Sequence, residues 1–242
     1  AACKTSFQLG VTATPCRLDG TGLGACYDTM VLGPSNGELI DQGYLVPADV
    51  YAPPNPIDLT GLRKRGGDYA VDELAKALDK PRITGDAVAH YQRIAHGKPA
   101  AAFCCSVEHA NDVAQEFRAA GYRAVSIDGK MEREARLDAT QGLVSGKYQI
   151  ITSCDIISEG FDVPRLEVGI MLRPTHSTGL WMQQSGRMFR PYPGKDRAIL
   201  LDHAGNSLKH GLPDEHRNWT LDGMEKTERD PGQQLRTCPK CL

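Results

Sequence analysis

Residues 98 to 127 read KPAAAFCCSVEHANDVAQEFRAAGYRAVSI, and this stretch decides the fold class. Ala100 to Cys105 is an apolar run typical of a buried strand, and Ser106 is a suitable N-cap for a helix. In the helix that follows, the apolar residues fall on one face: Ala110, Val113, Ala114 and Phe117. Gly121 ends that helix, and Ala124 to Ile127 form the next apolar run. A strand, a helix and a strand with short loops predict a parallel sheet.

The same alternation continues to about residue 204. We predict a helix within Arg133 to Ser145, ended by Gly146, and a second helix from Leu180 to Phe189. Further strands are expected at three apolar runs: Tyr148 to Thr152, Glu167 to Leu172 and Ala198 to Leu201. The fold class is therefore α/β, with helices on both faces of a parallel sheet and ligands at the carboxyl ends of its strands.

The residues before this region follow a different pattern. Phe7 to Thr14 alternates apolar with polar or small residues, which predicts a half-buried strand, and it starts too near residue 1 for a partner strand to precede it. Residues 16 to 66 are rich in Gly and Pro, so we expect a connection with one edge strand, Asp49 to Ala52. Two short helices follow, at Val71 to Leu78 and Ala87 to Ile94.

Composition excludes several classes of protein. The chain has 242 residues with 24% charged and 40% hydrophobic residues, which is ordinary for a globular protein and argues against disorder. No apolar run approaches the roughly 20 residues that span a bilayer, so no membrane partner is expected, and no secretory signal is recognised, so the expected location is cytoplasmic. The formal charge of −2 means that any phosphate-binding surface must be local. Of the eight cysteines, Cys104, Cys105 and Cys154 are best interpreted as buried reduced thiols.

The segment QQSGRMFRP at residues 183 to 191 carries the most chemical information. On a helix, Gln183, Arg187 and Arg190 lie on one face, and two guanidinium groups there favour an anion. Trp181 and Met188 then point into the core. The alternative is that the arginines are solvated or paired with an acidic residue, either Asp162 or Asp202.

Two further segments stand before it in a specific order: Thr12-Ala13-Thr14-Pro15, and Ser158-Glu159-Gly160-Phe161-Asp162-Val163-Pro164. The three segments resemble motifs III, V and VI of superfamily 2 helicases, and Ala101 to Val107 resembles motif IV. Ile127 to Lys130 resembles the short motif after the next strand. Thr12 to Gly24 is similar to the start of the linker in DEAD/DEAH-box proteins of the type III restriction and XPB-like group. Asp202 to Asn206 and Gly211 to Glu215 are similar to phage and bacterial versions of this group.

The resemblance implies a motor in which ATP and Mg²⁺ lie between two RecA-like lobes, this chain supplying the second lobe. Arg187 and Arg190 would be arginine fingers for the γ-phosphoryl group, and Gln183 would contact the γ-phosphate or the attacking water. Gly160 and Asp162 would line the nucleotide. Thr12 and Thr14 would couple the nucleotide state to lobe closure. The nucleic-acid backbone, expected to be DNA, would contact the ends of three strands: Ser106, Gly129, Lys130 and Ser153.

The sequence also departs from this family. Cys154 stands where DEAD-box relatives commonly have Thr, although Thr152 or Ser153 could replace that hydroxyl. A phosphate-binding loop and an Asp-Glu-x-His sequence are missing, so the chain looks like the rear half of a helicase that lacks its N-terminal RecA-like lobe.

We therefore expect four regions in the chain. Residues 1–47 would hold the end of the first lobe and the linker, and 48–97 an edge strand and helical connection. Residues 98–212 would form the second RecA-like lobe, and 213–242 a polar, mobile tail with the start of a zinc ribbon. In that tail, Cys238 and Cys241 have the spacing of half a Zn²⁺ site, which is incomplete. His203, His210 and His216 could complete it only in principle.

Three functions compete at this point. The first is the C-terminal part of an ATP-dependent helicase or translocase, whose isolated chain is inactive because both nucleotide-binding motifs of the first lobe are missing. The second is a non-catalytic RecA-like module that binds nucleic acid or a partner. The third is a Rossmann-type enzyme, which needs a Gly-rich turn after its first strand, and Cys105-Ser106-Val107-Glu108 offers none.

Overall fold

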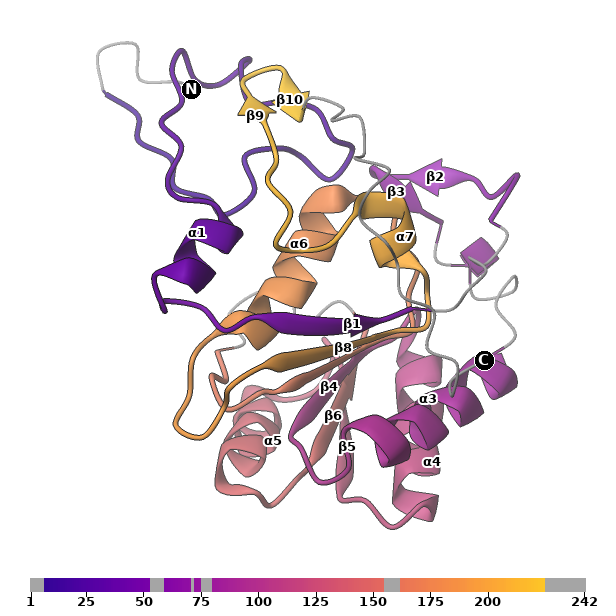
Figure 1. Ribbon diagram of the computed structural model, residues 1–242. Helices are drawn as coiled ribbons and strands as arrows, with labels where there is room; N and C mark the ends of the chain where they lie inside the picture. Colours follow the sequence, from indigo (N-terminus) through magenta and orange to yellow (C-terminus); the bar gives the residue numbers. More distant parts are fainter. Residues whose placement is uncertain (1–6, 53–58, 71, 75–79, 155–161, 225–242) are drawn as a thin grey trace.

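The computed structural model describes residues 7–52, 59–70, 72–74, 80–154 and 162–224. Its centre is a six-stranded sheet in the order β1-β8-β7-β4-β6-β5, and every pairing within it is parallel (Figure 1). The strands are β1 (Ala48–Tyr51), β4 (Ala100–Phe103), β5 (Ala124–Ile127), β6 (Ile150–Ser153), β7 (Val168–Met171) and β8 (Ala198–Asp202). The predicted α/β class and parallel sheet are confirmed.

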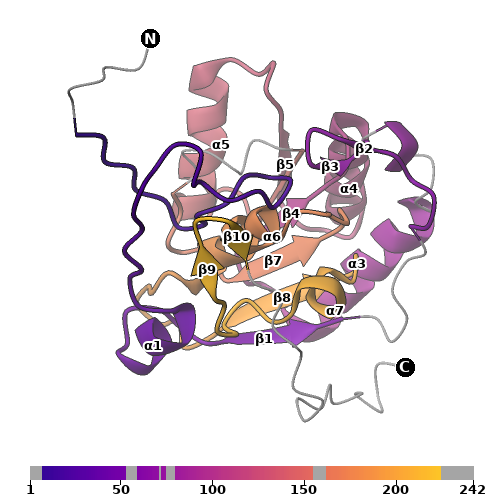
Figure 2. The same ribbon diagram turned by 90° about the horizontal axis from the view of Figure 1, so that it is seen from above.

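Helices cover both faces of this sheet, as expected for strands that are buried on both sides. On one face, α3 (Lys80–Ile94) and α4 (Val107–Ala119) pack on alternate strand residues such as Ala102 and Ile170. On the other face, α5 (Arg133–Ser145) and α6 (Thr178–Gly186) pack on the intervening residues, with Phe103 and Ile151 among them. Figure 2 shows the sheet between these layers.

Local sequence signals account for the helix ends. Ser106 accepts a hydrogen bond from the amide of His109 at 3.1 Å and so caps α4. Gly146 ends α5 at φ +83°, in the left-handed conformation that glycine adopts without strain. Ser35 and Glu38 form a reciprocal capping box on α1 (Asn36–Asp41).

Smaller elements surround the sheet. β2 (Lys64–Arg65) and β3 (Asp68–Tyr69) form a hairpin, and α7 (Asn206–His210) follows β8. β9 (Trp219–Thr220) and β10 (Gly223–Met224) form a second hairpin. No helix among the described residues is long and apolar enough to cross a membrane.

The strand expected at residues 7–14 is wrong, because the structure shows no strand there. Phe7, Leu9 and Val11 are 93%, 81% and 92% exposed. Alternation buries one face only when a sheet lies beneath it, and no described strand pairs with this segment.

The helix predicted to run to Phe189 is shorter than expected. α6 ends at Gly186, and a 3-10 turn η2 (Arg187–Phe189) follows. Arg190 is extended at ψ 131°, because Pro191 disfavours helical geometry in the residue before it. Trp181 and Met188 are buried, as predicted.

The described part of the tail is not loose. Arg217 is buried and donates hydrogen bonds to the carbonyls of Glu215, His210 and Leu212 at 2.9, 3.1 and 2.8 Å. The amide of Gly24 donates to the carbonyl of Leu221 at 2.8 Å, so the C-terminal hairpin holds the N-terminal segment. The polar composition of residues 212–224 gave no indication that these residues pack against the rest of the chain.

Candidate functional site

Asp162 and Arg190 form an ion pair although 28 residues separate them in the chain. Both side chains are accessible, at 70% and 40% of their surface. Arg187 lies half-buried, and the charges of Arg190 and Asp162 both act on it. Burial lowers the pKa of its guanidinium, the charge of Arg190 lowers it further, and Asp162 acts in the opposite direction. The structure thus combines two cations and one carboxylate. For Arg190 it shows the alternative that the sequence left open, an ion pair with Asp162.

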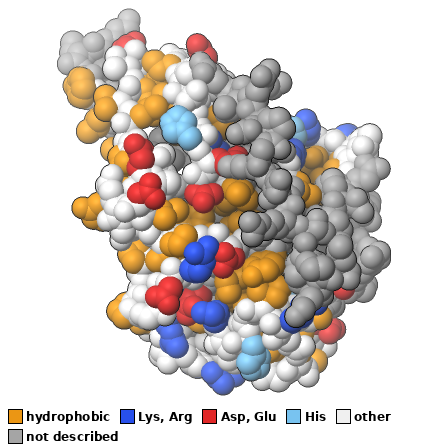
Figure 3. Space-filling view, in the orientation of Figure 1, with side chains coloured by type: hydrophobic (Ala, Val, Ile, Leu, Met, Phe, Trp, Pro, Cys, Tyr) orange, Lys and Arg blue, Asp and Glu red, His pale blue; other side chains and the backbone are white. Residues whose placement is uncertain are grey.

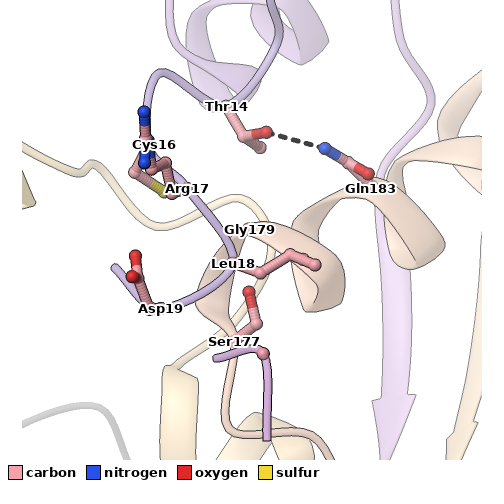
Figure 4. A pocket seen from close by; sticks show the side chains of 9 residues that line it. Thr14, Cys16, Arg17, Leu18, Asp19, Ser177, Gly179 and Gln183 are labelled. Atoms are coloured by element: carbon pink, nitrogen blue, oxygen red, sulfur yellow. Dashed lines mark hydrogen bonds between the residues drawn. The ribbon is translucent and has the colours of Figure 1, made fainter. Parts of the chain in front are cut away.

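Thr14 and Gln183 are the second pair that the structure brings together. The amide nitrogen of Gln183 donates to Thr14 Oγ1 at 2.9 Å, across 169 residues of sequence (Figure 4). Thr14 is 4% exposed, whereas Gln183 lies at the surface. Thr12 is exposed, and its hydroxyl donates to the carbonyl of Thr14 at 3.1 Å. The two threonines are therefore linked through a turn rather than along one face of a strand.

An open pocket of about 480 Å³ lies between this N-terminal segment and the start of α6. Besides Thr14 and Gln183, its lining includes Cys16, Arg17, Ser177 and Gly179, for which the sequence predicted no site role (Figure 4). Arg187 and Arg190 do not line it.

The third group lies at the carboxyl ends of three adjacent strands. Phe103, Ser153 and Ile127 are aligned in the registers of β4, β6 and β5, so the residues after them share one edge of the sheet. Ser106 follows β4, and Gly129 and Lys130 follow β5, so all three lie at this edge, with β6 between the two strands. Neighbouring strands are about 4.8 Å apart, so two such spacings separate β4 from β5.

These residues differ in their exposure and in the hydrogen-bonding groups that they could present to a ligand. Gly129 and Lys130 are exposed, but the amide of Lys130 already donates to Asp128 Oδ1 at 2.7 Å. Ser153 is 1% exposed, and its hydroxyl has no hydrogen-bond partner among the described residues. Thr152 donates internally to the carbonyl of Ala110 at 2.7 Å, so it does not replace the missing threonine hydroxyl at the surface.

Several predicted site residues lie outside the described residues: Gly160, Cys238 and Cys241. Within residues 7–52, 59–70, 72–74, 80–154 and 162–224, no group of three His, Cys, Asp or Glu side chains could hold a metal ion. His203 and His210 are both pushed toward the neutral form, since burial lowers the pKa of each to about 4. Neither is part of such a group.

Lys195 is a buried cation that sequence reasoning missed. It is 6% exposed, and its ammonium group donates to the carbonyls of Leu166, Arg190 and Pro164 at 2.6, 2.8 and 3.4 Å. Desolvation lowers its pKa to about 8. The only local signal was the Pro-Gly pair before it, which indicates a turn but no direction for the side chain.

Comparisons with known proteins bear on this geometry. Residues 80–191 match the family model described as the helicase conserved C-terminal domain. The chain is 39% identical over 238 residues to the 51.5 kDa protein of a Lactococcus phage (isolate 7-9), covering 97% of this chain and 52% of that protein. It is 26% identical over 230 residues to a protein of Schizosaccharomyces pombe named as the mitochondrial ATP-dependent helicase irc3, covering 91% of this chain and 36% of that protein.

A solved structure is similar in fold. It is a fragment of a protein assigned as the HsdR subunit of a type I restriction enzyme from Vibrio vulnificus YJ016, with a TM-score of 0.68 at 20% sequence identity. The match covers 87% of this chain and 42% of that one. The chain therefore spans about half the length, or less, of the relatives it matches. The sheet and its helices have the fold of a RecA-like lobe, and residues 80–191 belong to the helicase conserved C-terminal domain family.

Proposed function

We propose that this chain supplies the second RecA-like lobe of an ATP-dependent helicase or translocase that acts on DNA. The observation that carries the proposal is the convergence of Asp162, Arg187 and Arg190, which come from two separate segments of a helicase C-terminal domain. Gly160 and Asp162 would line the nucleotide from this lobe.

The cations present fit the phosphates of ATP. Two guanidinium groups can form charge-assisted, bidentate hydrogen bonds to phosphate oxygens. The ion pair between Asp162 and Arg190 is accessible to solvent, so a phosphate could compete for it. Asp162 would then release Arg190 to the phosphate as the lobes close. Arg187 is held in a partly desolvated position, which strengthens its interaction with developing negative charge.

The described residues that could bind ATP phosphates do not include a binding site for Mg²⁺. The described residues provide no cluster of carboxylates for it. We infer that an N-terminal RecA-like lobe holds the ion, which would neutralise charge on the β- and γ-phosphates when bound. That lobe would also pack on the exposed apolar side chains of Phe7, Leu9 and Val11.

Gln183 would connect the proposed nucleotide site with Thr14 in the N-terminal segment. It would orient the attacking water or contact the γ-phosphate with the oxygen of its amide, because the nitrogen donates to Thr14. Any shift of Gln183 on nucleotide binding would be felt at Thr14, and Thr12 is bonded to Thr14 in turn. This chain of hydrogen bonds is a route by which the nucleotide state could change lobe closure.

The isolated 242-residue chain should hydrolyse ATP no faster than background. Half of the groups that phosphoryl transfer needs, the phosphate-binding loop and the carboxylates for Mg²⁺, are missing from its sequence. A coupled phosphate-release assay with and without single-stranded DNA measures this. Turnover that rises with added DNA would show that the chain is a complete motor, and would overturn the assignment of a missing lobe.

Nucleic acid should bind weakly and without sequence preference. The net charge is −2, and Figure 3 shows acidic and basic side chains interspersed on one face rather than a broad basic area. We expect contacts at the strand ends, around Ser106, Gly129 and Lys130. Each neutralised phosphate on a single strand adds about 0.7 to the slope of log affinity against log salt, so the slope should be shallow.

Titrating a fluorescent single-stranded DNA at several salt concentrations tests this, with single-stranded RNA of the same sequence as the comparison. Lys130→Ala should weaken binding, whereas Lys147→Ala, which removes an exposed lysine paired with Asp138, is the matched control. A tight complex with a slope typical of about six to ten phosphate contacts would favour the non-catalytic binding module instead. Preference for RNA would contradict the expected DNA substrate.

A further inference from the structure

We propose that Lys195 is a positioning residue, which fixes Arg190 relative to Asp162 by tying together the two segments that carry them. This inference rests on the proposed function of Arg190. The ammonium group of Lys195 donates all three of its hydrogen bonds to backbone carbonyls and none to the side chains of Arg190 or Asp162.

The turn that delivers Lys195 is specified by local sequence. Its amide donates to the carbonyl of Tyr192 at 2.9 Å, and Gly194 between them has φ +81°. Pro193 followed by a glycine with positive φ is the signature of a tight turn. The chain therefore reverses after Arg190, and the side chain of Lys195 enters the interior.

Inside, the ammonium group has three acceptors for its three protons. Two of them, the carbonyls of Pro164 and Leu166, belong to the segment directly after Asp162. The third is the carbonyl of Arg190 itself, at 2.8 Å. A single group thus fixes the backbone beside both members of the ion pair.

The charge itself argues for this role. A buried cation is costly unless its hydrogen bonds are satisfied, and an apolar side chain of similar length would fill the same space at lower cost. The charged groups facing Lys195 are Glu167, Arg190 and Lys98, of which only Glu167 favours the protonated form. Glu167 is itself paired with Lys98. What an apolar side chain lacks is the ability to hold three carbonyls from two segments in one geometry.

The test is a double-mutant cycle in ATP hydrolysis, measured with the chain joined to an N-terminal RecA-like lobe. Lys195→Met should lower kcat about 100-fold with little change in KM, because a displacement of about 1 Å of a catalytic group costs that much. The double variant Lys195→Met with Arg190→Ala should be no slower than Arg190→Ala alone, within about twofold, since Lys195 acts through Arg190. Lys147→Met, the same substitution at an exposed ion pair, should have no effect.

Two outcomes overturn the inference. One is a Lys195→Met variant with normal kcat, and the other is additive losses in the double variant. If Arg190→Ala alone hydrolyses ATP normally, the proposed function of Arg190 fails. The link to Lys195 is then decided separately, by the side-chain Nε–H signal of Arg190 in the NMR spectrum of the isolated chain. That signal should shift in Lys195→Met and stay unchanged in Lys147→Met, and an unchanged signal in Lys195→Met overturns the link.

If Lys195→Met does not fold, the wild-type chain provides the same test. Selective labelling of lysine Cε follows the titration of Lys195, whose pKa desolvation lowers to about 8. Loss of one proton removes one of three donors, so the Arg190 signal should move with the same midpoint. An Arg190 signal that does not change across the titration of Lys195 overturns the proposal.

Discussion

Arg190→Ala and Arg187→Ala should each lower kcat for ATP hydrolysis by about 10³- to 10⁵-fold, the effect of arginine fingers in phosphoryl transfer. Nucleotide affinity should change much less, because a finger acts on charge that develops in the transition state. The measurement is steady-state hydrolysis with single-stranded DNA, using the chain joined to an N-terminal RecA-like lobe.

Arg197→Ala is the matched control for this pair. Arg197 is also an exposed arginine in an ion pair, with Asp49 at 2.6 Å, but it lies directly before β8. Near-normal hydrolysis in both Arg187→Ala and Arg190→Ala would reduce the ion pair with Asp162 to a surface contact. A surface pair of that kind contributes only about 0–1 kcal/mol to stability.

Trp181→Ala should cost about 3–5 kcal/mol in the free energy of unfolding, the usual cost of deleting a large buried aromatic side chain. Trp181 is fully buried among the residues that pack α6 on the sheet, and its indole N–H donates to the carbonyl of Gly211 at 3.1 Å. Trp181→Phe keeps most of the burial but leaves that carbonyl unpaired, which should cost about 1–3 kcal/mol.

Urea unfolding followed by circular dichroism measures both variants, because fluorescence changes when a tryptophan is removed. Trp219→Phe is the control, since Trp219 lies only partly buried in the C-terminal hairpin. If Trp181→Phe is as stable as the unmutated chain, the bond to Gly211 contributes nothing. Loss of less than about 1 kcal/mol in Trp181→Ala would contradict the packing of α6 described above.

The sequence predicted the sheet well because its signals are local. Ala124 to Ile127 is bounded by Gly121 and an aspartate, and the strand has those bounds. The capping serine of α4 and the glycine after α5 likewise fix helix ends within a few residues of the pattern. Such signals depend on neighbours in the chain, so they can be interpreted without knowing the fold.

Long-range contacts could not be predicted in the same way. Nothing around Lys195 indicates that its side chain points inward, and the bond between Gln183 and Thr14 joins residues 169 positions apart. The alternation of Phe7 to Val11 describes a strand that needs a neighbouring sheet. The ion pair between Arg190 and Asp162 is different, because the sequence already offered Asp162 as one of two acidic partners for the arginines.

The contact between Gly22 and the C-terminal hairpin sets the size of the smallest piece that can keep this shape. A Cβ at Gly22 would lie 2.0 Å from the carbonyl oxygen of Leu221, and Thr21 forms an antiparallel bridge with Gly223. The family match ends at residue 191, yet Thr21, Gly22 and Gly24 contact Leu221 and Gly223, which lie beyond it. A protein trimmed to the matched domain would lose β1, β8 and the N-terminal wall of the pocket, so domain boundaries for expression should follow these contacts.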